Sequence, residues 1–335
     1  MAKLMEVAEI NVSNLNDVSV GRNKIETVLN KAVSISPDAS WYLILDNQGK
    51  AIAQYIQVKA GDLTKYSALP TSRTTQAIQY QPVSLPQAIH LSDLPMVANA
   101  LKTNLPLAGT ELLSASVMQR LGLEQQASIG LRQQTIVSIP ESQQPFPEGI
   151  FDIDTGKVGL ATMAVVPIQM NTQVVGVAVV GTLINQNFEI VDRLRQKTGV
   201  ETATIFALDW RVSTNIPYMD HKTRAIGTRV AREVADAVLN RQTRFIGESN
   251  IVGQTYRTAY SPIYNHRKAI DPGTKPIGIA YVGQSQQLIQ KNLMSFALTS
   301  YGVGGTILFL AGFVVSPVAR SFSQALYRLA FLLKK

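Results

Sequence analysis

The chain has 335 residues and a formal net charge of +8 at pH 7, and charged residues make up only 16% of it. This length predicts two domains with separate cores and a small additional segment. Lysine and arginine are scattered and form no basic stripe with interleaved aromatic residues, which argues against a nucleic-acid partner. The chain contains no cysteine, and this excludes disulfides, thiolate metal sites and cysteine nucleophiles.

The first half opens with an amphipathic helix followed by a hairpin. Apolar residues recur at spacings of three and four from about 14 to 33, which predicts an entry helix. Two runs rich in strand-forming residues, Trp41–Asp46 and Lys50–Tyr55, flank the turn sequence Asn47–Gly49 and predict a β-hairpin.

The rest of the first half is rich in Pro, Ser, Thr and Gln. Between residues 61 and 133 it predicts only two helical stretches, at 94–101 and 112–121. The turn-rich run from Phe146 to Asp154 is the expected domain boundary.

The second half predicts a regular succession of strands and helices. Its expected elements, in chain order, are a hairpin at Val158–Ile168 and Gln173–Thr182, a helix at Asn187–Lys197, a strand at Glu201–Leu208, a helix at Thr228–Asn240, and strands at Arg244–Ile246, Ile251–Ile263 and Pro276–Val282. An antiparallel sheet with helices segregated to one face accommodates this order, so the expected fold class is α+β. A strand, glycine turn and strand recur in both halves, which favours two related domains.

One membrane-spanning helix is predicted near the C-terminus. No charged residue lies between Lys291 and Arg320, and the apolar stretch Met294–Ser316 is long enough to cross a hydrocarbon core of about 30 Å. A buried core helix is the alternative, but such a helix is rarely apolar on all faces for so long. Basic residues follow the stretch, so the positive-inside rule places the C-terminus in the cytoplasm and residues before 291 outside it.

An exported region of this size needs a signal, and the first ten residues lack the apolar core of a signal peptide. We therefore expect an N-terminal signal anchor upstream of this sequence in the native gene. The alternative is a tail-anchored protein whose large domain stays in the cytoplasm.

The second half resembles the extracytoplasmic Cache domains of bacterial chemoreceptors and sensor histidine kinases, especially the single-Cache type that forms the membrane-proximal half of double-Cache receptors. The stretches that carry the resemblance, in family order, are Val165–Ile168, Val175–Gly181, Ala203–Phe206, Arg211–Asn215, Arg224–Thr228, Phe245–Gly247, Val252–Gly253, Tyr256–Ile263 and Pro276–Gly283. The first half looks like a membrane-distal Cache domain only through Trp41–Gln54 and the entry helix. The resemblance implies two PAS-like Cache domains with antiparallel sheets and a long N-terminal helix.

The sequence after the membrane segment is similar to the first helix of a HAMP linker. Ser316-Pro317 is followed by apolar residues at spacings of three and four, from Phe322 to Leu333, which suit a parallel coiled-coil seam between two protomers. An amphipathic helix on the membrane surface is the alternative. The expected layout is an entry helix at 1–35, a distal Cache-like domain at 36–152, a proximal Cache domain at 153–290, a transmembrane helix at 292–316 and the start of a HAMP-like helix at 317–335.

The candidate binding site is the segment from Arg211 to Thr228 together with the strand that carries Tyr256 and Tyr260. The segment leaves a strand end, crosses a loop and enters the expected helix at Thr228, where backbone N–H groups favour an anion. Arginines on the same segment add donors suited to a carboxylate. In Cache receptors this segment lines the ligand cavity, and the resemblance implies that Thr214, Asn215, Arg224, Tyr256 and Tyr260 contribute. In the alternative interpretation these residues are solvated, fill turns, cap the helix or pack in the core.

Enzyme signals are scarce. The sequence has no phosphate-binding glycine loop, no Gly-x-Ser-x-Gly elbow and no His-Glu-x-x-His motif. The three histidines, at 90, 221 and 266, are far apart in sequence, so we expect no catalytic residues, no metal site and no cofactor.

These features predict a sensor module of a receptor in the bacterial inner membrane. It would bind a small extracytoplasmic molecule, such as an organic acid or amino acid, and signal across the membrane as a homodimer, in chemotaxis or a two-component system. The main alternative is a membrane-anchored assembly subunit whose Cache fold docks a partner protein without a ligand. A hydrolase on a Cache-like scaffold is a further alternative, for which no nucleophile and base are evident.

Overall fold

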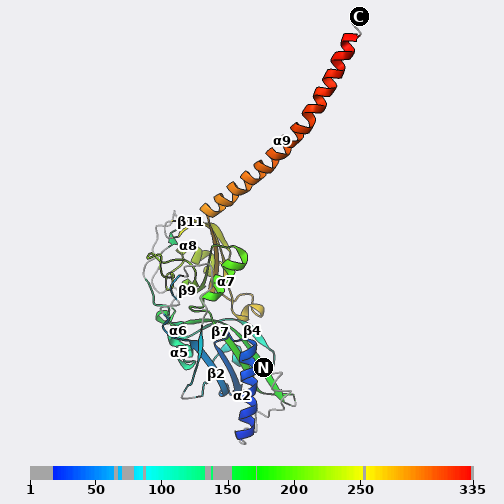
Figure 1. The fold of residues 1–335 in the computed structure, drawn as a ribbon. Coiled ribbons are helices and arrows are strands. Elements are labelled where there is room, and N and C mark those ends of the chain that lie inside the picture. Colours follow the sequence, from blue (N-terminus) through cyan, green and yellow to red (C-terminus); the bar gives the residue numbers. More distant parts are fainter. Residues whose placement is uncertain are drawn as a thin grey trace. The chain divides into compact units, whose positions relative to one another are not determined.

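The structure is a computed structural model that describes residues 18–63, 67–69, 79–85, 88–132, 137–138, 153–170, 172–251 and 254–332. The chain divides into two compact units, Met1–Gln284 and Ser285–Lys335. The first unit contains two six-stranded sheets, and the second contains one long helix (Figure 1). The expected boundary run at 146–149 and the first seventeen residues lie outside the described residues.

The first sheet has the strand order β3-β2-β1-β7-β6-β4, and its strands pair antiparallel. Their bounds are β1 Trp41–Asp46, β2 Ala51–Lys59, β3 Tyr80–Val83, β4 Leu107–Leu113, β6 Gly159–Met170 and β7 Gln173–Leu183. Both predicted hairpins, β1–β2 and β6–β7, are therefore present. They lie in one sheet because β1 pairs with β2 along one edge and with β7 along the other.

This placement of the β6–β7 hairpin differs from the sequence prediction, which assigned it to the second domain. Side chains explain the observed pairing. Trp41 of β1 packs directly over Gly181 of β7, where a Cβ atom would lie only 2.1 Å from the indole ring. The stretches Val165–Ile168 and Val175–Gly181 therefore belong to the first sheet, although they were part of the resemblance attributed to the second half.

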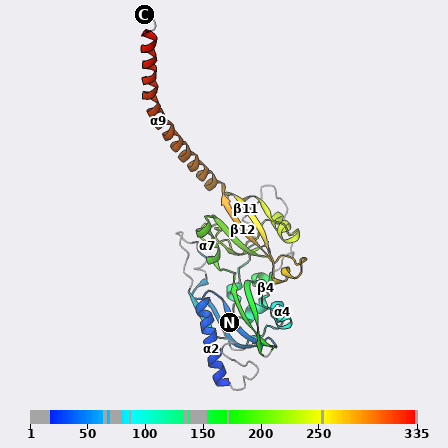
Figure 2. The ribbon, with the colours of Figure 1, turned by 90° about the vertical axis from the view of Figure 1, so that its right-hand side faces the viewer.

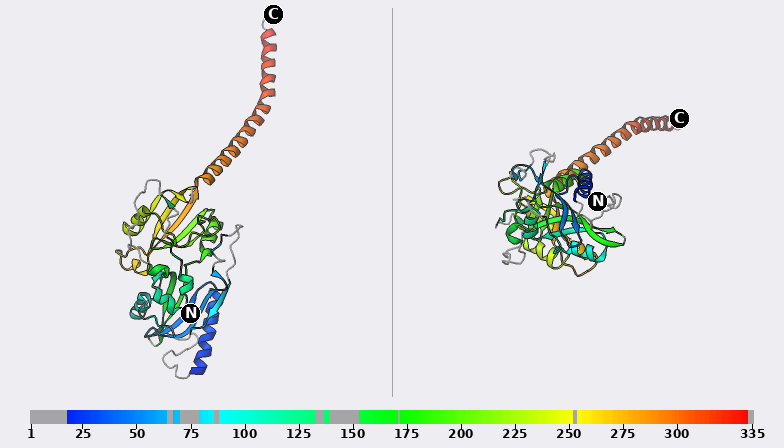
Figure 3. Two further views of the ribbon diagram at one scale, coloured as in Figure 1. Left: turned by 90° about the vertical axis from the view of Figure 1, so that its left-hand side faces the viewer. Right: turned by 90° about the horizontal axis from the view of Figure 1, so that it is seen from below.

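Helices cover both faces of the first sheet. Helix α2, Val18–Ile35, packs Ile25 and Leu29 against one face, on Tyr42 and Ile44 of β1 (Figure 2). The opposite face carries Trp41 of the same strand and packs against α4 Pro95–Thr103, α5 Ala115–Arg120 and α6 Glu124–Ala127, drawn cyan to teal in Figure 3. The alternation of side chains along a strand gives β1 one set of apolar residues for each face.

The second sheet has the order β5-β10-β11-β12-β8-β9. Its strands are β5 Val137–Ser138, β8 Thr202–Ala207, β9 Trp210–Thr214, β10 Phe245–Ile251, β11 Gln254–Ile263 and β12 Gly278–Ser285. Helix α7, Phe188–Thr198, ends at Gly199 in the left-handed conformation and packs through Phe188 and Val191 in a core with the alternate residues of β8. The other face is covered by the segment 216–239, which contains the short helix α8, Arg232–Ala235, and the π turn η3, Asp236–Asn240.

The helix expected at Thr228–Asn240 is shorter than predicted. Ordinary helical structure begins only at Arg232, after Ala231, and turns into a π turn at Asp236. Thr228 therefore does not lie at a helix N-terminus. Its backbone carbonyl instead accepts the N–H of Arg211, which holds this stretch extended beside β9.

The second unit is the helix α9, Gln286–Leu332, which continues through Pro317. Within it, residues 286–317 form the one helix among the described residues that is long and apolar enough to cross a membrane. This agrees with the predicted span at 292–316. The side chains expected to form a HAMP-like seam after the membrane lie outside the described residues.

Candidate functional site

The candidate site is the face of the second sheet that the segment 216–239 covers. Hydroxyl groups line this face because residues two apart on a strand point to the same side. Thr204 of β8 and Thr214 of β9 lie opposite each other, with their Oγ1 atoms 2.6 Å apart. Ser249 of β10 and Thr258 of β11 are diagonal neighbours in their strand pairing, and their hydroxyls are 3.2 Å apart. All four side chains are buried.

Arg211 is the charged residue on this face. It lies opposite Phe206 in the β8–β9 pairing, and its guanidinium carbon is 4.9 Å from the centre of that ring. One terminal nitrogen donates to Thr228 Oγ1 at 2.5 Å, and Nε has no hydrogen-bond partner. The side chain is 1% exposed. Burial lowers the pKa of Arg211 to about 10, so the group remains charged at neutral pH.

No carboxylate among the described residues pairs with Arg211. The acidic residue nearest in sequence, Asp209, forms its ion pair with Arg229 instead, at 2.5 Å. Burying an unpaired guanidinium is costly, since its charge loses the stabilisation that water provides. Arg211 is therefore a buried cation without a counter-ion in the part of the chain that the structure describes.

Two tyrosines complete the surroundings of Arg211. The rings of Tyr260 and Tyr281 are 4.8 Å apart, and both residues belong to the core on this face. The Tyr260 hydroxyl is buried next to the hydroxyls of Ser249 and Thr258, and burial raises its pKa. Tyr256, two positions before Thr258 on the same strand, donates to Gln254 Oε1 at 3.1 Å.

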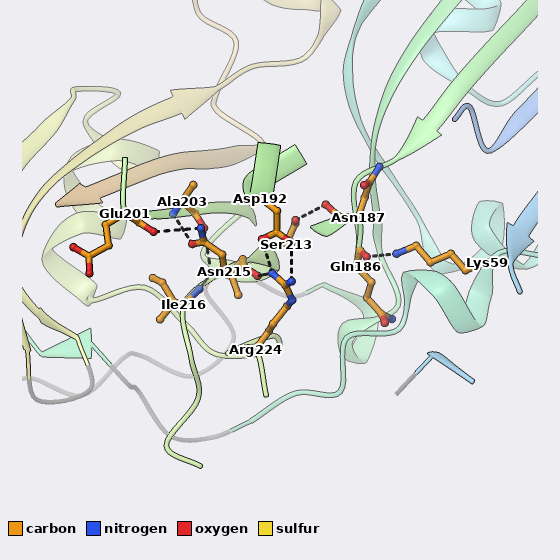
Figure 4. Close-up of polar contacts among 11 residues, drawn as sticks. Lys59, Gln186, Asn187, Asp192, Glu201, Ala203, Ser213, Asn215, Ile216 and Arg224 are labelled. Carbon is orange, nitrogen blue, oxygen red and sulfur yellow. Dashed lines mark hydrogen bonds and ion pairs between the residues drawn. The ribbon is translucent and has the colours of Figure 1, made fainter. Parts of the chain in front are cut away.

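Arg224 lies in a different environment, where it is already paired (Figure 4). Its two terminal nitrogens donate to the two carboxylate oxygens of Asp192 on α7, at 2.9 and 2.8 Å. The first of them also donates to the backbone carbonyl of Thr214 at 3.0 Å, and the guanidinium stacks on Phe188. This buried bidentate pair ties the 215–228 loop to α7, which is a structural role.

The polar residues around Arg224 also bond within the protein. Asn215 accepts the N–H of Ala203 at 2.7 Å and donates to the carbonyl of Glu201, as Figure 4 shows. Thr214 accepts the N–H of Ile216 at 3.0 Å. The hydroxyl of Thr228 donates to the carbonyl of Ala225 at 2.8 Å. These bonds fix the loop and leave few free groups on it.

Segments from the first half of the chain hold the same loop from outside. The N–H of Leu69 donates to the carbonyl of Lys222, and the N–H of Arg224 donates to the carbonyl of Ser67. On the other side, the N–H of Arg132 donates to Gly227, whose positive φ of 73° and close approach to the backbone at residue 130 leave no room for a side chain. The loop is thus positioned by residues that are distant in sequence.

The structure brings five of the seven predicted site residues onto one face: Arg211, Thr214, Thr228, Tyr256 and Tyr260. Arg224 and Asn215 bond instead to α7 and to the start of β8. Sequence reasoning missed Asp192, the partner of Arg224, and the hydroxyl residues of β8 and β10. Alternation along β8 could have identified Thr202 and Thr204 as neighbours of Phe206. No group of three potential metal ligands occurs among the described residues.

Comparison with known families supports the resemblance of the second half. Residues 182–296 match the family Single cache domain 3. This segment is similar to a Cache domain. It contains β8 to β12, Arg211 and the loop that covers the hydroxyl-lined face, and it leaves nearly all of the β6–β7 hairpin outside. No curated protein sequence matches the chain.

The whole chain is also similar to solved sensor-domain structures. The periplasmic domain of Vibrio cholerae LuxQ has 12% identity and a TM-score of 0.35, and the match covers 85% of this chain and 91% of that one. The ligand-binding domain of the Campylobacter jejuni chemoreceptor Tlp3, in complex with 4-methylisoleucine, has 10% identity, a TM-score of 0.40, and coverage of 87% and 82%. The Pseudomonas aeruginosa amino acid chemoreceptor PctB, in complex with L-Arg, has 11% identity, a TM-score of 0.34, and coverage of 86% and 87%.

Proposed function

We propose that this chain is the extracytoplasmic sensing region of a transmembrane receptor, a chemoreceptor or a sensor kinase, and that its Cache domain binds a small carboxylate-bearing molecule. The match of residues 182–296 to a Cache family and the apolar helix at 286–317 support this role. In this proposal the first sheet forms the distal domain, with the boundary after β7. The helix crosses the bacterial inner membrane, and the C-terminus is cytoplasmic.

The observation that carries the proposal is the buried, unpaired guanidinium of Arg211. A guanidinium offers a planar fork of donors that matches the two oxygens of a carboxylate. Nε of Arg211 lacks a partner among the described residues. A ligand carboxylate would supply the missing counter-ion and accept from Nε, so its binding would remove a desolvation cost that the free protein carries.

This assignment replaces Arg224 by Arg211 as the proposed anchor of the acid. Arg224 already has a carboxylate at 2.8 Å, and a ligand would have to compete with Asp192 for it. In this proposal the ligand signals by changing the arrangement of the loop that covers the site. A ligand held between Arg211 and the loop at Thr228 binds one loop arrangement better than another, and only such a difference shifts a two-state receptor. We propose that the receptor works as a homodimer through α9.

The test is a thermal-shift screen on the full chain in detergent micelles, with organic acids, amino acids and neutral solutes. We expect an acid to stabilise the protein and Arg211→Met to weaken its binding about ten- to a hundredfold, the value of a lost charged hydrogen bond of about 1.5–3 kcal/mol. Arg257→Met is the matched control, because Arg257 is exposed on strand β11 of the same sheet and its substitution removes the same charge.

Two outcomes would overturn the assignment. In one, only neutral compounds stabilise the protein, and no carboxylate is recognised. In the other, an acid stabilises the wild type and Arg211→Met to the same degree, and Arg211 is then not its anchor. An equal loss in Arg257→Met would show that net charge, and not the buried fork, controls the response.

A further inference from the structure

A second candidate site lies away from Arg211, in a cavity of about 160 Å³ in the first unit. Its walls come from the start of α4, from β4 and β6, and from the 265–277 segment that precedes β12. The apolar side chains in the wall include Leu94, Met96, Leu113, Met163 and Ile277. Glu111, at the centre of β4, is the acidic residue in the lining. The cavity thus combines an apolar wall with one carboxylate.

Only one carboxylate oxygen of Glu111, Oε1, has hydrogen-bond partners among the described residues. Its Oε1 accepts the backbone N–H of His266 at 3.1 Å and contacts the ring Nδ1 of His266 at 2.6 Å. No described residue bonds to the second oxygen, Oε2, and the residue as a whole is only 7% exposed. The free oxygen belongs to a side chain that lines the cavity. Glu111 therefore offers a hydrogen-bond acceptor without a described partner to whatever occupies that space.

His266 contacts both Glu111 and Asn99. The amide nitrogen of Asn99 lies 3.3 Å from the ring Nε2 of His266. When the amide N–H is donated to Nε2, a neutral ring keeps its proton on Nδ1 and donates it to Glu111. In this arrangement the carboxylate of Glu111 keeps its negative charge. Arg267 also lines the cavity, but its side chain is exposed and water screens its charge.

We propose that this cavity binds a small ammonium-bearing molecule, with its ammonium group on Glu111 and its carbon chain against the apolar wall. An ammonium supplies both the missing donor and the missing positive charge. The volume sets the size, since a cavity of about 150 Å³ in another protein holds one benzene molecule. The ligand therefore has about five or six non-hydrogen atoms. This site is separate from the acid site at Arg211 and does not depend on it.

The test compares n-butylammonium with n-butanol, which has the same carbon chain and no charge. Both are titrated calorimetrically into the full chain in lipid nanodiscs, with empty nanodiscs as the reference for uptake by lipid. We expect n-butylammonium to bind the wild type at least tenfold more tightly, because its hydrogen bond to Glu111 is charge-assisted. Equal binding of the two compounds, or no binding of n-butylammonium, would overturn the proposal without any variant.

A substitution tests whether Glu111 binds the ammonium group. Glu111→Gln keeps the shape and the acceptor for the His266 N–H, and we expect it to reduce n-butylammonium binding to the level of n-butanol. Glu124→Gln is the control at a partly exposed glutamate on α6 that pairs with Lys157, and it should leave binding unchanged. Arg211→Met should also leave it unchanged, which separates this site from the acid site. Undiminished binding in Glu111→Gln would place the ammonium elsewhere and refute the assignment.

Discussion

The two sheets of the first unit bury different kinds of side chain. The face of the first sheet that meets α4 to α6 is mainly apolar and includes Trp41, Leu43 and Leu45, with Glu111 on its edge strand β4. The covered face of the second sheet instead carries Arg211 and a set of buried hydroxyls among its aromatic rings. Burial of apolar side chains stabilises a fold whatever the orientation of the side chains. Burial of a polar group costs free energy unless the group is hydrogen-bonded. The contrast teaches that the hydroxyls of the second sheet offset their burial by bonding to each other, whereas the charge of Arg211 has no counter-ion among the described residues.

The same contrast exists on a smaller scale between two buried arginines of the second half. Arg224 has a bidentate carboxylate partner, and Arg211 has none among the described residues. Removing one partner of a buried pair strands the other charge, whereas removing a lone buried charge relieves a cost. The same substitution should therefore destabilise the protein strongly at Arg224 and change its stability little at Arg211. The two tryptophans help to measure this, because Trp41 lies in the first sheet and Trp210 in the second.

The largest effect is expected for Arg224→Met. The substitution leaves Asp192 buried and unpaired, and we expect a loss of about 3–5 kcal/mol in the free energy of unfolding. Urea unfolding of the full chain, followed by Trp210 fluorescence in a Trp41→Phe background, measures it. The double variant Arg224→Met with Asp192→Leu should regain most of the loss, since no charge is then stranded. A loss below about 1 kcal/mol would mean that the pair is not structural.

The next effect is a dependence of stability on pH that originates at Lys59. Burial lowers the pKa of Lys59 to about 7, helped by the charge of Arg224. Its ammonium donates to the carbonyl of Gln186 in the linker between the two sheets, as Figure 4 shows. The unfolded chain holds this proton up to about pH 10.5 and the folded chain only to about 7, so unfolding takes up a proton between these values. Stability should therefore rise with pH there, by up to about 1.4 kcal/mol per unit.

Urea unfolding between pH 7.5 and 9.5 measures this slope and stays below the range in which tyrosines ionise. Lys59→Met is the comparison, and we expect it to flatten the rise over these two pH units. A wild-type curve that is flat or falls over the range would contradict the prediction. An unchanged slope in Lys59→Met would assign the effect to another group.

The smallest effect is expected for Arg211→Met in the absence of ligand. The substitution removes a buried charge that has no counter-ion, and the methionine side chain can pack against Phe206. The desolvation penalty that is removed offsets the lost hydrogen bond to Thr228. The free energy of unfolding should therefore change by no more than about 1 kcal/mol. A loss as large as that of Arg224→Met would show that Arg211 is structural, and the acid site proposed here would then be wrong.

The helices and strands that are specified by residues close together in the sequence could be predicted. The β1–β2 and β6–β7 hairpins follow from strand-forming runs on either side of short turns, and α7 ends at the glycine that predicted its end. The apolar run near the C-terminus also became one helix, α9, because an uncharged stretch of that length specifies its structure without a partner. The candidate segments named from the sequence contain Arg211, Tyr256 and Tyr260, which lie on one face of the second sheet.

Contacts between distant residues were decided only by the tertiary structure. The β6–β7 hairpin joined the first sheet because Gly181 leaves space for Trp41, a match that neither sequence segment reveals alone. Arg211 and Arg224 look equivalent in the sequence, and the structure distinguishes them because Asp192 on α7 is placed next to one and not the other. Glu111 and His266 are likewise paired across 155 positions. Sequence patterns fix which residues share a face, but a charge acquires or loses its partner only when separate elements pack together.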